Sequence, residues 1–245
     1  MVVPGRRPAL EAVRAGSARE LLIAEEARST VGLREVLEAA AAAGVRVRRV
    51  PTEDIDRQAG GVLHQGVLAV AVPPTPLGEA DLMARRWPEE AVVLVADGVS
   101  DPQNLGALAR TAEAAGASLM VLRERRGGGA TAAAVKASAG ALLHLRVASV
   151  PNLPRAIAGL KDRGFWVAGL DARASLTIWE TRPPGGRVAL VVGAEGEGLS
   201  RLVRERCDFL VRIPMRGRVG SLNVAVAAGI ALFGYALPGK EAGGP

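Results

Sequence analysis

Cysteine and histidine are scarce in this 245-residue sequence, which contains one cysteine, Cys207, and two histidines, His64 and His144. A single cysteine excludes an intrachain disulfide and a zinc site built from several thiolates. Two histidines leave few ligands for any other metal centre. The sequence therefore predicts a protein that works without a bound metal.

Aromatic residues make up only 3% of the chain, too few for a fold or an RNA-binding surface built on stacked rings. Apolar residues reach 49% and charged residues 23%, a balance that excludes wholesale disorder and predicts a core of Ala, Val and Leu. We expect the three tryptophans, Trp87, Trp166 and Trp179, to anchor the edges of that core.

Lysine is also scarce: of the 31 basic residues only Lys136, Lys161 and Lys240 are lysines, and the formal net charge is +6. Arginine forks suit phosphate groups, so the charge favours a polyanionic partner such as a nucleic acid. A modest positive charge that simply maintains solubility is the alternative.

Long apolar segments are missing. The N-terminus has no apolar run long enough for a signal peptide. The longest largely apolar stretch, Leu222 to Leu237, is shorter than the ~20 residues that span a bilayer. We therefore expect a cytoplasmic protein with no membrane partner.

Two domains are expected from the length of the chain and from its prolines. The run from Pro73 to Pro76 continues neither a strand nor a helix, because each proline removes a backbone donor and fixes φ. It marks a linker, residues 74–90, between a domain of residues 1–73 and a domain of residues 91–245. In the first domain, helices are expected near 9–14 and 33–43, and strands near 21–23, 45–50 and 67–72.

The second domain alternates between unbroken apolar strands and helices. This pattern predicts a parallel sheet covered by helices on both faces, with ligands at the carboxyl ends of the strands. The expected strands lie near residues 91–96, 119–122, 145–148, 165–170, 188–192 and 209–213. The expected helices lie near residues 103–115, 131–142, 153–163, 198–205 and 222–237.

The first of three unusual loops, DGVSDPQNLG, follows the strand at 91–96. Asp101 is expected to cap the next helix, with Pro102 in its first turn. Arg110 interrupts an otherwise apolar stretch of that helix. From spacing alone, an arginine that reaches solvent or pairs with Glu113 is the more common arrangement.

The second loop, GAEGEGLS, begins at Gly193, and its glycines allow the backbone to approach a ligand closely. It matches neither a P-loop nor the dinucleotide-binding fingerprint, and a tight strand-to-helix turn is an equally good interpretation. The third loop, IPMRGRVGSLNV, begins at Ile213 and passes two arginines before a helix rich in small residues. Such a helix fits a subunit interface or, more commonly, a buried core helix.

Taken in order, the three loops resemble the three motifs of the SpoU/TrmH class of RNA ribose 2′-O-methyltransferases, within the SPOUT superfamily. The matching stretches are DGVSDPQNLGALARTAEAAG, LVVGAEGEGLS and IPMRGRVGSLNVAVAAGIALF, and the KASAGAL stretch at 136–142 also fits. The N-terminal part through HQG, at 64–66, resembles the small substrate-binding domain that precedes the catalytic domain in many members. The arrangement is most similar to the branch that methylates a guanosine of 23S ribosomal RNA.

This resemblance implies an α/β catalytic domain with a C-terminal trefoil knot, preceded by a small L30e-like α/β domain that binds the RNA substrate. It implies S-adenosyl-L-methionine as the cofactor and a homodimer packed through the knot region. The cofactor-binding positions that it implies are Gly193, Glu195, Gly196, Ile213, Met215, Ser221 and Leu222.

For catalysis, the resemblance implies that Arg110 activates the ribose 2′-hydroxyl, with Asn104, Glu195 and Asn223 completing the site. A guanidinium is normally protonated at neutral pH. Arg110 therefore acts either as a true base or as a positioning group that stabilises charge together with an RNA phosphate. Contacts with RNA are expected from Arg216, Arg218 and His64.

Two positions depart from the family pattern: Ala225 stands where many members have serine, and Leu143 where many have an acidic residue. Neither change touches Arg110, Asn104 or the loop at Gly193, so we expect activity with altered cofactor affinity. The alternatives are a tRNA ribose methyltransferase, an rRNA adenosine resistance methyltransferase, and a catalytically silent RNA-binding protein of ribosome assembly. A nucleotide-dependent oxidoreductase is disfavoured, because neither glycine fingerprint is present.

Overall fold

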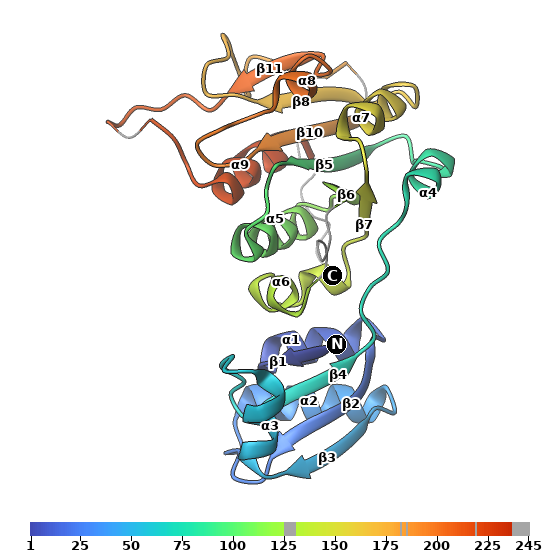
Figure 1. The fold of residues 1–245 in the computed structure, drawn as a ribbon, viewed down its shortest axis with the longest axis vertical. Coiled ribbons are helices and arrows are strands. Elements are labelled where there is room, and N and C mark those ends of the chain that lie inside the picture. Colours follow the sequence, from blue (N-terminus) through green and yellow to red (C-terminus); the bar gives the residue numbers. More distant parts are fainter. Residues whose placement is uncertain (125–130, 182, 185, 219, 237–245) are drawn as a thin grey trace. The chain divides into compact units, whose positions relative to one another are not determined.

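In a computed structural model of the protein, residues 1–124, 131–181, 183–184, 186–218 and 220–236 are described (Figure 1). They group into two compact units, one of residues 1–75 and 131–144 and the other of residues 76–124 and 145–236. Each unit has its own sheet. The expected helix end at Leu237 lies outside the described residues.

The N-terminal unit is built on a four-stranded sheet in the order β1-β4-β2-β3. Strand β4 pairs antiparallel with β1 and β2, whereas β2 and β3 pair in parallel. Leu22, Ile55 and Leu68 form part of its aliphatic core. The elements are β1 (Val2–Pro4), α1 (Arg6–Arg14), β2 (Ala18–Ala24), α2 (Val31–Ala42), β3 (Arg46–Val50), α3 (Thr52–Ala59), β4 (Val67–Ala71), α6 (Ala132–Ala137) and the 3-10 helix η1 (Ala141–Leu143).

Segment 131–144 packs within this N-terminal unit, with α6 against β1 and η1 against α1. Gly140 is required there, because a Cβ at this position would collide with the Cβ of Glu11. His144 Nε2 lies 2.9 Å from Glu11 Oε2. The helix expected over 131–142 ends at Ala137, because Ala139 and Gly140 adopt φ of 52° and 95° and redirect the chain.

The C-terminal unit holds a seven-stranded sheet in the order β7-β6-β5-β10-β8-β11-β9, and each pair of neighbours is parallel. The chain runs outward from β5 to β7, continues on the other side with β8 and β11, and places β10 between the two groups. The reversal of strand order at β10 is a topological switch point, where α/β sheets bind ligands. The elements are α4 (Glu79–Ala84), β5 (Ala91–Asp97), α5 (Pro102–Ala114), β6 (Leu119–Arg123), β7 (Val147–Val150), α7 (Leu153–Lys161), β8 (Trp166–Leu170), β9 (Leu176–Thr177), β10 (Arg187–Gly193), α8 (Arg201–Arg204), β11 (Phe209–Arg212) and α9 (Val224–Ala236).

Helices cover this sheet, as its unbroken apolar strands predict. Val93 and Val95 of β5 share a buried cluster with Ile157 of α7, and successive residues of a strand face opposite sides. Helix α9 contacts β5, β10 and α5. The α5–α9 approach is close, because a Cβ on Gly229 would lie 3.0 Å from the Thr111 methyl group.

The expected α/β architecture with a parallel C-terminal sheet is confirmed. Strands β1 and β9 and helices α3 and α4 were not expected, and α4 lies inside the expected linker. The helix expected over 198–205 is reduced to α8, because Gly196 and Gly198 have φ of 80° and 69° and form a tight loop before it.

The prediction for the tryptophans is correct only in part. The rings of Trp87 and Phe165 meet edge to face with centroids 4.8 Å apart, as a core-edge residue should. Trp166 and Trp179 instead are 38% and 61% exposed. Among the described residues, no helix is both long and apolar enough to cross a membrane.

Candidate active site

A cavity of about 690 Å³ opens where β8, β10 and β11 end. The seven positions expected to bind a cofactor all line it. The parallel register places Gly193, the last residue of β10, beside Asp97, the last residue of β5. The first two motif loops therefore start side by side at one edge of the sheet, where this class of fold binds ligands.

The loop after β10 is shaped by its glycines. The Gly198 N–H donates to Ala194 O at 2.9 Å and closes the loop on itself. A Cβ on Gly193 would lie 2.5 Å from Leu199 N and closer still to the Gly198 carbonyl, so no side chain fits there. Glycine is required at 193 because the backbone there packs directly against the backbone of Gly198 and Leu199. The backbone of the same loop forms one wall of the cavity.

Asn223 joins the three motif loops in one hydrogen-bond network. Its Nδ2 donates to Asn104 Oδ1 at 3.0 Å and to Glu195 Oε1 at 2.7 Å. Its Oδ1 accepts from the backbone N–H of Ala225 at 3.0 Å, which caps the start of α9. Three of the four residues expected in catalysis, Asn104, Glu195 and Asn223, therefore meet at one point, although Asn104 and Asn223 are 119 positions apart.

Asp97 ties the first loop to the second and was missed in the sequence. The residue is 7% exposed, and its carboxylate accepts from the Ser200 N–H at 2.7 Å. Gly98 has φ of 76° and turns the chain beside Ala194. An acidic residue at the end of an unbroken apolar strand was the available signal, because a buried carboxylate needs a partner.

Arg110 lies on the exposed side of α5. Arg110 follows Asn104 by six residues on this helix, which correspond to about 9 Å of rise and a rotation of 600°. The two side chains are therefore not neighbours on one face of α5. Among the described residues the structure gives Arg110 no hydrogen bond and no ion pair, so of the two arrangements that spacing favours it reaches solvent and does not pair with Glu113. The guanidinium is therefore available to a group from outside this chain.

The three residues expected to contact RNA have different surroundings. Arg216 and Arg218 are exposed in the segment between β11 and α9, which extends away from the sheet in Figure 1. His64 is 13% exposed and both of its ring nitrogens are engaged. Nδ1 accepts from the Gly66 N–H at 3.0 Å, so Nε2 carries the proton that is donated to Asp56 Oδ1 at 2.8 Å.

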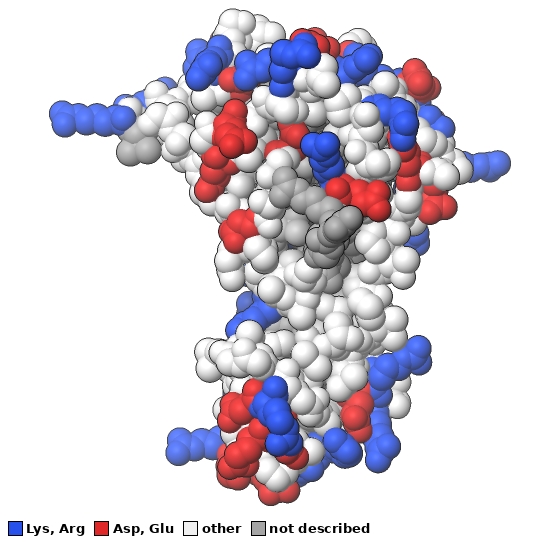
Figure 2. Space-filling model, viewed as in Figure 1, with Lys and Arg blue, Asp and Glu red and all other residues white. Residues whose placement is uncertain are grey.

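His64 therefore holds its loop in place. Its neighbour Gln65 adopts φ of 55°, an uncommon conformation for a residue other than glycine, and is exposed. Arg6 Nε supports that conformation by donating to Gln65 O at 3.2 Å. Lys and Arg side chains are interspersed with Asp and Glu on the face seen in Figure 2, so charge alone does not delimit an RNA-binding patch there.

Two family models match this chain. The model described as the SpoU rRNA Methylase family matches residues 91–233, and the model for RNA 2′-O ribose methyltransferase substrate binding matches residues 2–77. The first match covers more than half of the chain and contains all three motif loops.

The chain belongs to the SpoU rRNA methylase family.

Curated relatives agree with this SpoU assignment. An uncharacterized tRNA/rRNA methyltransferase of Mycolicibacterium vanbaalenii is 43% identical over 235 residues, which cover 94% of this chain and 74% of the relative. A 23S rRNA (guanosine-2′-O-)-methyltransferase of Photobacterium profundum is 41% identical over 191 residues, 78% of each chain.

Solved structures agree as well. A crystal structure of an RNA 2′-O ribose methyltransferase has a TM-score of 0.79 at 28% identity, with 97% of this chain and 87% of the other covered. A SpoU methyltransferase of Streptomyces viridochromogenes in complex with S-adenosylmethionine has a TM-score of 0.74 at 25% identity, with 96% and 89% covered. As a SpoU family member, this protein is an S-adenosylmethionine-dependent RNA 2′-O-methyltransferase with an N-terminal substrate-binding domain.

The cavity of this SpoU protein suits its cofactor. Met215 and Leu222 add apolar surface to the lining, of the kind that an adenine ring packs against, and the Gly193 loop presents backbone rather than side chains. Glu195 contributes a carboxylate, which favours the positive charge of a sulfonium. The volume of about 690 Å³ lies in the range of small-molecule sites.

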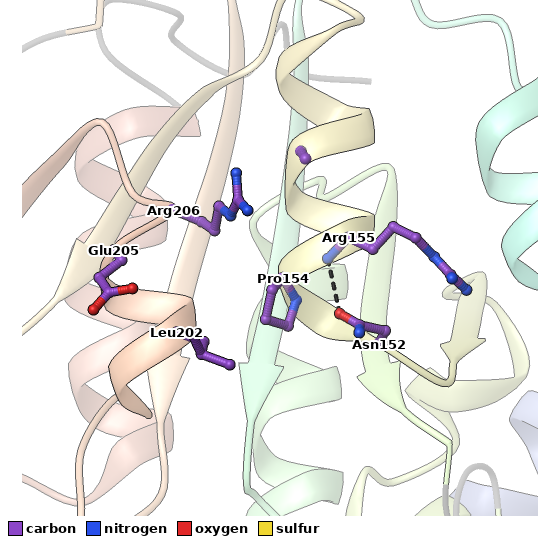
Figure 3. Close-up of a pocket in the computed structure, with 7 residues that line it drawn as sticks. Asn152, Pro154, Arg155, Leu202, Glu205 and Arg206 are labelled. Atoms are coloured by element: carbon purple, nitrogen blue, oxygen red, sulfur yellow. Dashed lines mark hydrogen bonds between the residues drawn. The ribbon is translucent and has the colours of Figure 1, made fainter.

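A second, smaller groove of about 530 Å³ lies between α7 and α8 (Figure 3). Its Arg155 is already engaged, because the guanidinium pairs with Glu79 and lowers the pKa of that carboxyl. The Arg155 N–H donates to Asn152 Oδ1 at 3.0 Å, the bond drawn in Figure 3. This groove therefore offers less to a cofactor than the cavity at the strand ends.

Within the part of the chain that the structure describes, no three His, Cys, Asp or Glu side chains are grouped as metal ligands. Burial raises the pKa of the Cys207 thiol to about 12, with the nearby Asp208 carboxylate adding to the shift. The thiol donates weakly to Val203 O at 3.4 Å. Cys207 is therefore a packing residue and not a nucleophile.

Proposed function

We propose that the protein methylates the ribose 2′-hydroxyl of a guanosine in 23S ribosomal RNA, in the cytoplasm. The observation that carries the proposal is the network of Asn223 with Asn104 and Glu195 beside the cavity, within a chain of the SpoU family. The Photobacterium profundum relative carries the name of that reaction. The match of residues 2–77 to a substrate-binding model favours residues 1–73 as the RNA-binding domain, with 74–90 as a linker and 91–245 as the catalytic domain.

In this proposal the cofactor is held by the walls of the cavity. Backbone of Gly193, Ile213 and Met215 faces the adenosine part, with Glu195 and Gly196 beside the second loop and Ser221 and Leu222 beside the third. S-adenosylmethionine, when bound, supplies an electrophilic methyl group on a sulfonium. Asn223 orients Asn104 and Glu195, so that the ribose meets preset polar groups.

Arg110 acts on the ribose hydroxyl, which must lose its proton as its oxygen bonds to the methyl carbon. Because a guanidinium is protonated at neutral pH, we assign it to stabilising the developing negative charge and holding an RNA phosphate. Its exposure and lack of partners in the described residues fit a group that is engaged only when RNA is present. Arg216 and Arg218, exposed in the third loop, would contact further phosphates, and His64 would support the substrate-binding domain.

We further propose a homodimer that packs through α9 and the knot that the family resemblance implies. Val226, Ile230 and Phe233 are 52%, 38% and 45% exposed and recur at i, i+4 and i+7. They therefore form one apolar stripe along the helix. A second chain on this stripe would cover it and would lie near α5, which contacts α9 and carries Arg110.

The test is methyl transfer from tritium-labelled S-adenosylmethionine to total rRNA and, separately, to total tRNA from a strain that lacks this gene. We expect label in large-subunit rRNA, at a nucleotide whose adjoining linkage resists alkali. Label in tRNA alone would overturn the substrate and keep the enzyme class. Absence of label in rRNA, tRNA and purified ribosomal particles would overturn the proposal.

Arg110→Ala tests the proposed mechanism in the same assay. The variant should keep the fold and cofactor affinity and lose transfer by at least about 100-fold, the scale expected when a charge-stabilising group is removed. Arg201→Ala is the matched control, because Arg201 is an exposed helical arginine that pairs with Glu205 outside the cavity. Near wild-type transfer by Arg110→Ala would remove Arg110 from the mechanism.

A further inference from the structure

Asp171 is a carboxylate in the cavity that no sequence motif assigned. It directly follows β8, and it lines the same cavity as Gly193 and Met215. Its side chain is only 8% exposed. A buried charge at the carboxyl end of a strand, in the wall of a ligand cavity, calls for a function.

The backbone of Asp171 is fixed on both sides. Its N–H donates to Val211 O at 3.0 Å, and its carbonyl accepts from the Ala174 N–H at 3.0 Å. The first bond joins the end of β8 to β11, the strand that leads into the third loop. The backbone from which the carboxylate extends therefore has a defined position at the edge of the cavity.

The carboxylate retains capacity to accept further hydrogen bonds. Oδ1 accepts from the Arg173 N–H at 2.9 Å. Oδ2 lies 2.6 Å from Arg204 Nη1, but that contact lacks hydrogen-bond geometry, and within the described residues Oδ2 accepts no hydrogen bond. Two carboxylate oxygens together accept about four. Arg204 thus neutralises the charge without saturating the group.

We propose that Asp171 accepts a hydrogen bond from a ribose hydroxyl of the adenosine part of the cofactor. The inference rests on the proposed placement of the cofactor in this cavity. In dinucleotide-binding α/β folds an acidic side chain accepts a hydrogen bond from a ribose hydroxyl, so a carboxylate is a suitable partner for such a group. Sheet order adds a geometric reason: β8 is two strands from β5, about 10 Å away at ordinary strand spacing. Asp171 therefore follows a strand on the other side of β10 from the strand that leads to Asn104, the residue that the proposed function places beside the reacting RNA ribose.

The experiment measures binding by titration calorimetry with S-adenosylhomocysteine and with its 2′-deoxy and 3′-deoxy analogues. We expect the wild-type protein to bind the ribose form at least about tenfold more tightly than one of the deoxy forms, as for a lost hydrogen bond to a charged acceptor. Asp171→Ala should weaken the ribose form by a similar factor and bind that deoxy analogue no more weakly than the wild type does. The decisive quantity is the ratio of the affinity for S-adenosylhomocysteine to the affinity for the deoxy analogue.

Three further variants separate this role from a structural one. Arg204→Ala removes the ion pair and should keep most of the preference for the ribose form. Asp171→Asn, which replaces Asp171→Ala if that variant fails to fold, should retain part of the preference. Asp162→Asn, in an exposed carboxylate at the end of α7 outside the cavity, is the matched control and should leave both affinities unchanged. Equal losses for ribose and deoxy ligands in Asp171→Ala, or no preference in the wild type, would overturn the ribose contact. If Gly193→Ala bound S-adenosylhomocysteine as tightly as the wild type does, the result would instead count against the placement of the cofactor in this cavity.

Discussion

Replacing Gly193 by alanine tests whether the shape of the second loop creates the cofactor cavity. The added Cβ would lie 2.5 Å from Leu199 N and closer to the Gly198 carbonyl, where ordinary contacts are at least 3.4 Å. The obstructing atoms belong to the backbone and cannot rotate away. The loop must therefore move by about 1 Å or more.

The magnitude follows from that displacement. Overpacking of this kind costs about 1–3 kcal/mol of stability, which lowers the melting temperature by roughly 2–4 °C per kcal/mol for a chain of this length. The moved loop carries Glu195, whose carboxylate lies 2.7 Å from Asn223 Nδ2. A misplacement of about 1 Å at a reacting centre costs on the order of 100-fold in rate. We expect cofactor affinity to fall at least about tenfold.

Calorimetric titration with S-adenosylhomocysteine measures the affinity, and single-turnover methyl transfer measures the rate. Gly217→Ala is the matched control, because a Cβ there meets no atom within 4 Å, and its affinity should stay within about twofold of the wild type. If Gly193→Ala bound the cofactor as tightly as Gly217→Ala, the close backbone contact would not be what shapes the cavity.

Three more changes give distinct outcomes. Asn223→Ser keeps a side-chain cap for α9 but loses the donor shared by Asn104 and Glu195. The free energy of unfolding should therefore change by less than about 1 kcal/mol, while methyl transfer falls about tenfold. Unchanged transfer would refute the role of the network. Because the pKa of the Cys207 thiol is raised to about 12, alkylation by iodoacetamide at pH 8 should be far slower in the native protein than in urea, and equal rates would contradict its burial. His64→Ala removes the Nδ1 acceptor and should weaken rRNA binding in a filter assay at fixed salt. His64→Asn keeps an acceptor and should weaken the binding less. The reverse order of affinities would exclude a positioning role for His64.

The parts of the fold that were predictable are those encoded over short distances. Strand β5 is an unbroken apolar run, and Asp101 caps α5 through a hydrogen bond of 3.1 Å to the Asn104 N–H, as its place before Pro102 predicts. Elements without such local patterns were missed. Strand β1 has three residues, and α4 lies in a stretch that its flanking prolines suggested was a linker.

The site was predictable only as a set of positions. The motif order indicated which loops to expect together, and the seven cofactor positions do line one cavity. The bonds that organise it depend on tertiary structure: β10 lies between β5 and β8, and only this order brings Glu195 and Asn104 to Asn223. Spacing along the chain contains no information about such pairings, so Asp97 and Asp171 could be noted only as acidic residues at the ends of apolar strands, without their partners.

The packing of segment 131–144 against β1 and α1 affects how this protein can be divided. Ala134, Val135 and Leu142 are fully buried, although they are distant in sequence from the rest of the N-terminal unit. A fragment that ended at Thr75 would expose the surface that they cover, and a fragment that began at Pro76 would carry them with no partner. Exchange of RNA specificity between relatives therefore requires chimeras that transfer residues 1–75 and 131–144 together, since a single crossover at the proline-rich stretch would split one hydrophobic core between two parents.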